Sequence, residues 1–160
     1  AFEKRGIDSL GDAAFDIVVS NQVIEHVHNT GHYLSEINRV LRTGGKMVVS
    51  LPNIMNPRHF LAMLVGDIEG RLKRTSEEIL QHYDKTHHHI HAWHPQSFVT
   101  LCATVGFRFE RYLPMEGIPF PFRRPFRPYL YWKNRRLRNW SYTMAFSFTK
   151  VREVRIDCSE

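Results

Sequence analysis

Hydrophobic residues follow strand-like spacing in four short stretches of this chain. Residues 16–20 are largely apolar and β-branched at even and odd positions alike, which is typical of a central strand covered on both faces in a parallel sheet. A second buried strand is predicted at 46–51 and a third at 107–113. Residues 140–151 alternate apolar or aromatic side chains with small, mostly polar ones, and this periodicity predicts a last strand.

Helical spacing of apolar residues fills the intervals between these strands. A helix is predicted at 34–41, where the glycine pair 44–45 supplies the left-handed residues that end a helix at little energetic cost. Asparagine followed by proline predicts the start of a helix at 57–65, and a glycine follows it. A short helix at 76–83 and an amphipathic helix at 95–105 complete the series. Strands alternating with helices in this order predict an α/β domain.

The composition is that of a globular domain without a membrane-spanning segment. The chain has 160 residues, of which 42% are hydrophobic and 24% are charged, so it can bury a core. Its longest apolar runs fall far short of the ~20 residues that a membrane helix needs, and its start lacks the basic-then-apolar order of a signal peptide. Two cysteines do not suggest a disulfide framework, so we expect a reducing, cytoplasmic setting. Cys102, on the apolar stripe of the last predicted helix, is expected to be a small buried hydrophobe.

One segment makes the chain basic. The formal net charge is +6, and seven of the 22 Lys and Arg residues lie within 123–138. The surrounding segment 117–139 interleaves arginine with aromatic residues, and its prolines argue against one continuous amphipathic helix. Such a segment suits an anionic membrane surface, which would make the protein peripheral to a membrane, or a phosphate-bearing substrate. An arm that packs on the domain or on a second subunit is the alternative. Arginine with aromatics also suits single-stranded nucleic acid, which we do not expect here.

Four sequence motifs give the chain a family resemblance. FDIVV runs into the pair EH within 15–26, RVLRTGG occupies 39–45, and the strand after it ends in PN. The stretch from His89 to Phe107, HIHAWHPQSF followed by VGF, carries the fourth motif. Together these motifs resemble the second half of a class I S-adenosylmethionine (SAM) dependent methyltransferase of type 11 or 23. The resemblance implies a Rossmann-like sheet whose final strand inserts antiparallel between its two predecessors.

The resemblance also predicts the domain organisation. We assign 1–152 to the C-terminal part of a SAM-dependent methyltransferase domain, with 114–139 as a basic, aromatic and proline-rich insertion and 153–160 as a tail. The glycine-rich loop that opens such domains has no counterpart in these residues. The sequence therefore predicts an N-terminally truncated domain that, taken alone, binds SAM poorly and is inactive.

The expected cofactor residues follow strand ends. Ligands of open α/β sheets lie beyond the carboxyl ends of the strands, where loops and helix N-termini converge. The resemblance implies that the backbone of the loop after FDIVV contacts the methionine part of SAM and that the loop's apolar side chains wall the adenine. It also implies that an acidic residue near the start of the chain contacts the adenine. The residues assigned to SAM on this basis are Phe2, Glu3, Ser20, Asn21, Gln22 and Val23.

Two histidines are the expected catalytic residues. Methyl transfer from a sulfonium needs orientation of the reactants and, for an alcohol or phenol acceptor, a base. Histidine suits that role near neutral pH. His26 begins the helix over the cofactor and His89 matches a family histidine, with a bracing role as the alternative for both, while Glu25 is expected to be a charge at a helix end. The residues expected to bind the acceptor are Pro52, Asn53, His91 and Trp93.

A histidine-rich stretch invites a metal interpretation. Six of the ten histidines lie between His82 and His94, and alternate residues of an extended chain share one face. No cysteine or acidic residue is spaced to close a tetrahedral set of ligands, so no metal is expected. A polar loop over the substrate is the preferred interpretation.

The function implied by the resemblance is SAM-dependent methylation of a small molecule or of a lipid-linked or sugar-linked acceptor. A non-catalytic, methyltransferase-like partner that binds through its basic arm is the first alternative. A nicotinamide-dependent oxidoreductase is the second, and the alternating strand at 140–151 argues against it. That strand follows a long loop and suits an antiparallel final hairpin, whereas the oxidoreductase sheet is expected to remain parallel.

Overall fold

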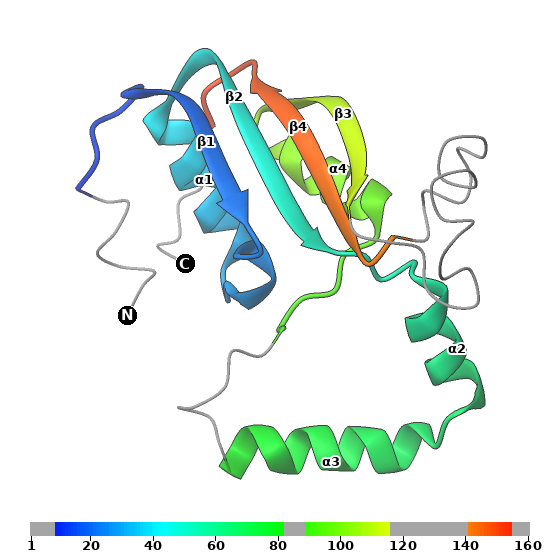
Figure 1. The fold of residues 1–160 in the computed structure, drawn as a ribbon. Helices are drawn as coiled ribbons and strands as arrows, with labels where there is room; N and C mark the ends of the chain where they lie inside the picture. Colours follow the sequence, from blue (N-terminus) through cyan, green and yellow to red (C-terminus); the bar gives the residue numbers. More distant parts are fainter. Residues whose placement is uncertain (1–8, 82–88, 116–140, 155–160) are drawn as a thin grey trace, which may run out of the picture.

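The computed structural model describes residues 9–81, 89–115 and 141–154, and its elements alternate between strands and helices (Figure 1). In chain order they are β1 (Phe15–Asn21), the 3-10 turn η1 (Ile24–His26), α1 (Thr30–Val40), β2 (Leu41–Pro52), α2 (Pro57–Val65), α3 (Ile68–Gln81), α4 (Pro95–Thr104), β3 (Phe107–Met115) and β4 (Thr143–Lys150). None of the described helices is long and apolar enough to cross a membrane.

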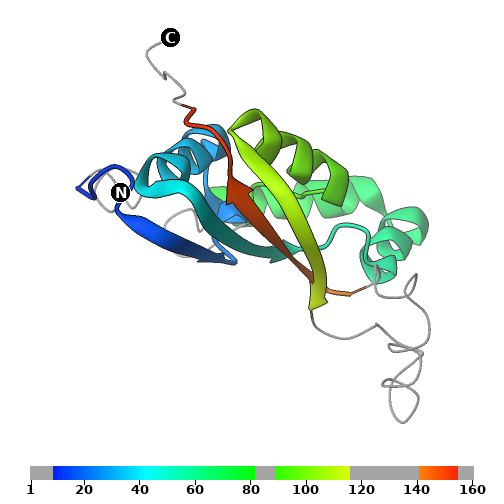
Figure 2. The same cartoon turned by 90° about the horizontal axis from the view of Figure 1, so that it is seen from above.

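The four described strands form one mixed sheet in the order β1-β2-β4-β3. β2 runs parallel to β1, and β4 runs antiparallel to both of its neighbours. Figure 2 shows β4 between β2 and β3, although β3 precedes β4 in the chain. The predicted antiparallel insertion of the last strand, and with it the Rossmann-like fold class, is confirmed.

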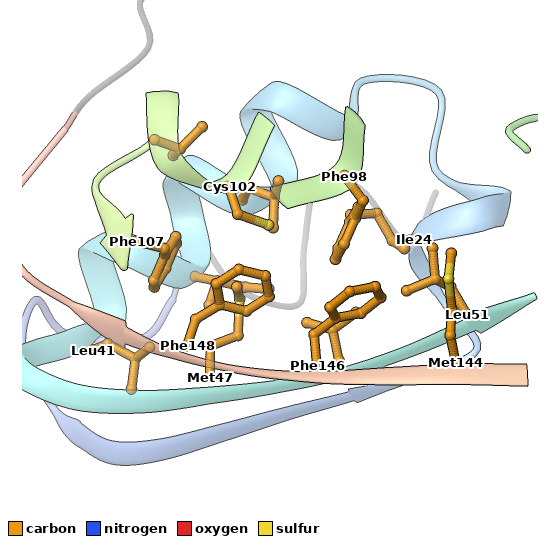
Figure 3. Close-up of a cluster of buried hydrophobic side chains, with 14 residues drawn as sticks. Ile24, Leu41, Met47, Leu51, Phe98, Cys102, Phe107, Met144, Phe146 and Phe148 are labelled. Atoms are coloured by element: carbon orange, nitrogen blue, oxygen red, sulfur yellow. The ribbon is translucent and has the colours of Figure 1, made fainter. Parts of the chain in front are cut away.

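The core lies between this sheet and the helices α1 and α4 on one of its faces (Figure 3). Side chains alternate along a strand, so every second residue of β2 and β4 points toward the helices. α4 contributes Phe98 and Cys102, which pack among these strand residues. Burial raises the pKa of the Cys102 thiol, and the prediction of a small buried hydrophobe is confirmed. The buried residues from β2 and β4 are Met47, Val49, Leu51, Met144, Phe146 and Phe148.

The prediction that the first strand is central and covered on both faces is wrong for the described residues. β1 lies at one end of the described strand order, and Ile17 and Val19 are 60% and 67% exposed. The reason is that α1 and α4 lie on the opposite face, which β1 meets through Val18 and Ser20. In the described residues, only the face of β1 toward α1 and α4 is covered.

Two helix boundaries also differ from prediction. α1 ends at Val40 and β2 begins directly at Leu41, so the glycine pair lies inside the strand. Gly44 has φ of 82°, and the pairing of β1 with β2 is irregular nearby, between Phe15 and Ile17. The predicted short helix at 76–83 is instead the longer α3. α2 and α3 lead away from the sheet (Figure 1), while the predicted starts of α2 and α4 at proline are confirmed.

Candidate functional site

The loop after β1 lies against the end of β2. Gln22 has φ of 52°, an uncommon conformation for a residue with a side chain. Its backbone N–H donates to the carbonyl of Ser50 (3.0 Å), and the Ser50 hydroxyl donates to the Asn21 side chain. Backbone outliers held by their surroundings cluster at functional sites. The carboxyl ends of two parallel strands thus meet here, as the sequence analysis expected.

Ser20 is the residue before the last one of β1, and it is buried. It is 2% exposed, and its hydroxyl lies 2.9 Å from the hydroxyl of Tyr33 in α1. Burial raises the pKa of the Tyr33 hydroxyl, and the hydrogen bond to Ser20 partly opposes that shift. The side chain of Ser20 therefore braces β1 on α1. A contact from Ser20 to SAM would come from its backbone.

Glu25 lies in η1 and is completely buried. With the Gln22 amide oriented so that its nitrogen faces Glu25, that nitrogen donates to Oε1 (3.1 Å) and the amide oxygen accepts from the Leu51 N–H (3.1 Å). The other oxygen, Oε2, has no hydrogen-bond partner among the described residues. Glu25 lies in the first turn of η1, as expected of a charge at a helix end, but its complete burial was not predicted.

The two predicted catalytic histidines lie together. The N–H groups of Ile90 and His91 both donate to the carbonyl of Glu25, at 2.8 and 3.1 Å. These bonds hold the segment that enters α4 beside η1, as Figure 1 shows for the green chain that passes the loop after β1. The rings of His26 and His89 meet edge to face, with centroids 4.8 Å apart. Fold contacts thus join residues from two distant motifs.

His91 and Trp93, two of the expected acceptor-binding residues, continue along the same segment. Their rings lie 5.6 Å apart, and Trp93 packs against Phe98 of the core. The Nε2 atom of His91 and the Nε1 atom of Trp93 are buried, and neither has a hydrogen-bond partner in the described part of the chain. Buried polar atoms are nearly always paired in folded proteins. These two atoms are therefore candidates for contact with a ligand.

The other two expected acceptor-binding residues lie at the end of β2. Asn53 is buried, its amide donates to the carbonyl of Ser141 (2.9 Å), and its side-chain oxygen accepts from the N–H of Met55 (3.0 Å). Pro52, the last residue of β2, pairs with Thr143. Asn53 thus ties the end of β2 to the start of β4, and its contact with an acceptor stays a prediction.

Several predictions fall outside the described residues. Phe2 and Glu3 of the expected cofactor site lie there, as do most of the histidine-rich stretch (82–88) and the basic arm 117–139. The membrane surface expected for that arm stays a prediction. Within the described part, Tyr33 and Ser50 contact the end of β1 and the loop after it. These contacts were not predicted, because no local pattern marks contacts between residues so far apart in the chain.

Comparisons with known proteins bear on the family and the fold. Residues 5–49 match a family model described as a methyltransferase domain. A protein of Mycolicibacterium smegmatis named probable S-adenosylmethionine-dependent methyltransferase is 52% identical over 44 residues, which are 28% of this chain and 17% of that protein. The ubiquinone biosynthesis O-methyltransferase of Bradyrhizobium is 44% identical over 52 residues, which are 32% of this chain and 20% of that protein.

Among solved structures, a SAM-dependent methyltransferase from Archaeoglobus fulgidus has a TM-score of 0.54 with this chain at 14% identity, and the match covers 90% of this chain and 63% of that one. The chain has the fold and a sequence signature of the class I SAM-dependent methyltransferases. Its matches span about a fifth of the two curated relatives. The matched residues 5–49 include β1, η1, α1 and most of β2. Ser20, Gln22, Glu25 and His26 all lie within this matched part.

Proposed function

We propose that the protein is a SAM-dependent methyltransferase that acts on a small molecule or on a lipid-linked or sugar-linked acceptor. The observation that carries this proposal is the loop from Ser20 to His26, where a family sequence match coincides with the meeting of two parallel strand ends. Buried polar atoms without a partner in the described residues, on Glu25, His91 and Trp93, lie on this loop and on the segment beside it. That combination favours a ligand site over a purely structural turn.

The loop after β1 is the proposed binding site for the methionine part and the adenine of SAM, as the family resemblance implies. When bound, SAM supplies a methyl group on a positively charged sulfur, which is already activated for displacement. Val23 is 38% exposed, which suits an apolar wall for the adenine. Asn21 is exposed at the end of β1, and Gln22 holds the loop through its bonds to β2. The chain's own contribution is therefore to bind and orient.

The acceptor would lie toward the segment 89–93. His26 and His89 are the proposed groups that assist loss of the acceptor's proton, since imidazole is suited to proton transfer near neutral pH. An oxygen acceptor is favoured because the Bradyrhizobium relative is named as an O-methyltransferase. His91 and Trp93 would then hydrogen-bond the rest of the acceptor through Nε2 and Nε1, which have no partner among the described residues.

Binding of SAM tests the proposal. We expect the full-length protein to bind SAM in a calorimetric titration. Val23→Arg should weaken that binding roughly tenfold or more, because a long charged side chain then replaces the apolar wall proposed for the adenine; tenfold corresponds to about 1.4 kcal/mol. Val151→Arg is the matched control, since Val151 is 44% exposed and follows β4 instead of β1. Equal SAM affinity in both variants would mean that the cofactor does not bind at the loop after β1.

The same titration addresses the non-catalytic alternative. A partner protein that keeps only the fold would not bind SAM, and the full-length protein would then give no heat of binding. Binding of SAM together with transfer of a radiolabelled methyl group to an extract of small molecules and lipids would support the enzyme.

A further inference from the structure

We propose that Glu25, His26 and His89 form a binding site for a divalent first-row transition metal ion such as Zn²⁺ or Mn²⁺. One ligand atom from each of the three side chains can be chosen so that all of them lie within 4.8 Å of one another. The site joins a buried carboxylate, a half-buried imidazole and an exposed imidazole. The binding of the ion rests on these side chains alone, whereas its chemical role, described below, rests on the proposed methyltransferase function.

The buried carboxylate is the strongest reason for a cation. Glu25 is 0% exposed, and its Oε2 has no hydrogen-bond partner in the described residues. Burying an ionised carboxylate is costly unless a cation or hydrogen-bond donors compensate it. The Gln22 amide satisfies only Oε1. A metal ion bound at Oε2 would supply the missing partner and the opposite charge together.

The backbone holds the third ligand in place. His89 comes from the segment before α4, and it would be free to lie elsewhere without a tether. The next two residues, Ile90 and His91, both donate their N–H groups to the carbonyl of Glu25. The carboxylate and the backbone that carries His89 are therefore fixed to each other. Glu25 thus supplies the acidic ligand that the sequence of the histidine-rich stretch lacks.

The donor set indicates which ions would bind. Two imidazoles with one carboxylate suit zinc, manganese, iron or cobalt, whereas magnesium and calcium prefer oxygen ligands. Metal–ligand distances in such sites are about 2 Å, so the three ligand atoms must move closer together. His89 is exposed, and rotation of its side chain can bring about this approach. Three protein ligands leave coordination positions open for an oxygen of the acceptor.

The ion would activate the acceptor. A hydroxyl oxygen bound to a divalent cation loses its proton far more readily, because the cation stabilises the negative charge that remains. The O–H bond breaks with its proton passing to water. The oxygen then bonds to the methyl carbon as the bond from that carbon to sulfur breaks, which leaves a neutral thioether. With the ion bound, His26 and His89 would assist proton loss as its ligands, and this role would replace the direct proton transfer to imidazole described under the proposed function.

Metal titration of the full-length protein tests the site. After removal of metals with a chelator, we expect the protein to bind one Zn²⁺ or Mn²⁺ ion per chain by calorimetry, and Co²⁺ to give the visible absorption of a coordinated ion. His89→Ala and Glu25→Gln should each weaken the affinity at least about tenfold. His32→Ala, in α1, is the matched control and should bind as the wild type does.

Each outcome bears on one of the two proposals. Lack of stoichiometric binding, or unchanged affinity in the His89→Ala variant, overturns the metal site. Because His89 is exposed, that variant is expected to fold even if Glu25→Gln does not. SAM binding measured on the same chelated protein separates the proposals: a protein that binds SAM but no metal keeps the proposed function and loses the cation.

Discussion

Gly106 lies where α4 turns into β3, and its backbone adopts φ of 86°. A Cβ at this position would lie 2.5 Å from the carbonyl oxygen of Arg152 and 3.0 Å from the amide nitrogen of Asn38. Both the conformation and the space therefore require glycine. We expect Gly106→Ala to lower the free energy of unfolding by about 2–4 kcal/mol, measured by urea denaturation of the full-length protein.

Substitutions at two other glycines distinguish the effect of a positive φ from the effect of a steric clash. Gly44 also has a positive φ, of 82°, but a Cβ there would meet nothing within 4 Å, so Gly44→Ala should lose about 1–2 kcal/mol from the conformation alone. A Cβ on Gly11 would likewise meet nothing, and Gly11 has no positive φ, so Gly11→Ala should stay within roughly 0.5 kcal/mol of the wild type. Equal losses for Gly106 and Gly44 would rule out the steric clash.

At the scale of single residues, motif positions were predictable and their partners were not. His26 and His89 were assigned from sequence resemblance, and the structure brings their rings together. The burial of Glu25 was not foreseen, because it depends on Gln22 and on the segment before α4, which reach it only through the fold. Local patterns report propensity and periodicity, and they carry no information on which distant residue covers a carboxylate.

Among the helices, α4 shows how a start is specified. His94 is the residue before its first turn, its Nδ1 accepts from the N–H of Gln96 (3.2 Å), and Pro95 occupies the first helical position. We expect His94→Ala to lower the free energy of unfolding by about 1 kcal/mol and His94→Ser to retain most of the stability, since serine also caps helices. Thermal melting of both variants measures the difference, and equal melting temperatures would count against the cap.

Helices and strands were predicted best where residues that start or end an element coincide with a pattern of buried apolar residues. α2 and α4 begin at prolines, and β4 carries Met144, Phe146 and Phe148 at alternate positions, all three of them in the core. The extent of α3 was underestimated although Ile68, Leu72 and Ile79 recur at helical spacing, and none of its residues is buried in the described structure. β1 was predicted to lie in the middle of a sheet because it has apolar residues at even and odd positions. In the described structure Ile17 and Val19 are exposed.

At the scale of the molecule, side chains that span the chain connect the helical layer to the sheet. The buried amide of Asn38 in α1 donates to the carbonyls of Val105 (2.9 Å) and Arg152 (3.0 Å), which flank β3 and β4. Lys150, the last residue of β4, is 3% exposed and donates to the carbonyls of Asn38 (2.6 Å) and Leu41 (2.8 Å). The late strand is thus bonded to the end of an early helix.

Lys150 should therefore matter to global stability. A cation at the C-terminal end of a helix satisfies carbonyls that have no partner within the helix and interacts favourably with the helix dipole. Lys150→Met keeps a long apolar side chain but removes the donor, which leaves the buried carbonyls of Asn38 and Leu41 without it. We expect a loss of about 2–3 kcal/mol in the free energy of unfolding, measured by urea denaturation.

Lys73→Met supplies the comparison. Lys73 lies on α3 and pairs at the surface with Glu69 (2.8 Å), and exposed pairs of this kind contribute little to stability. If the bonds from β4 to α1 hold the two layers together, Lys150→Met should shift the unfolding midpoint clearly and Lys73→Met should leave it almost unchanged. A similar midpoint for the two variants would mean that apolar packing alone joins the late strand to the early helix, since methionine preserves that packing while the hydrogen bonds are gone.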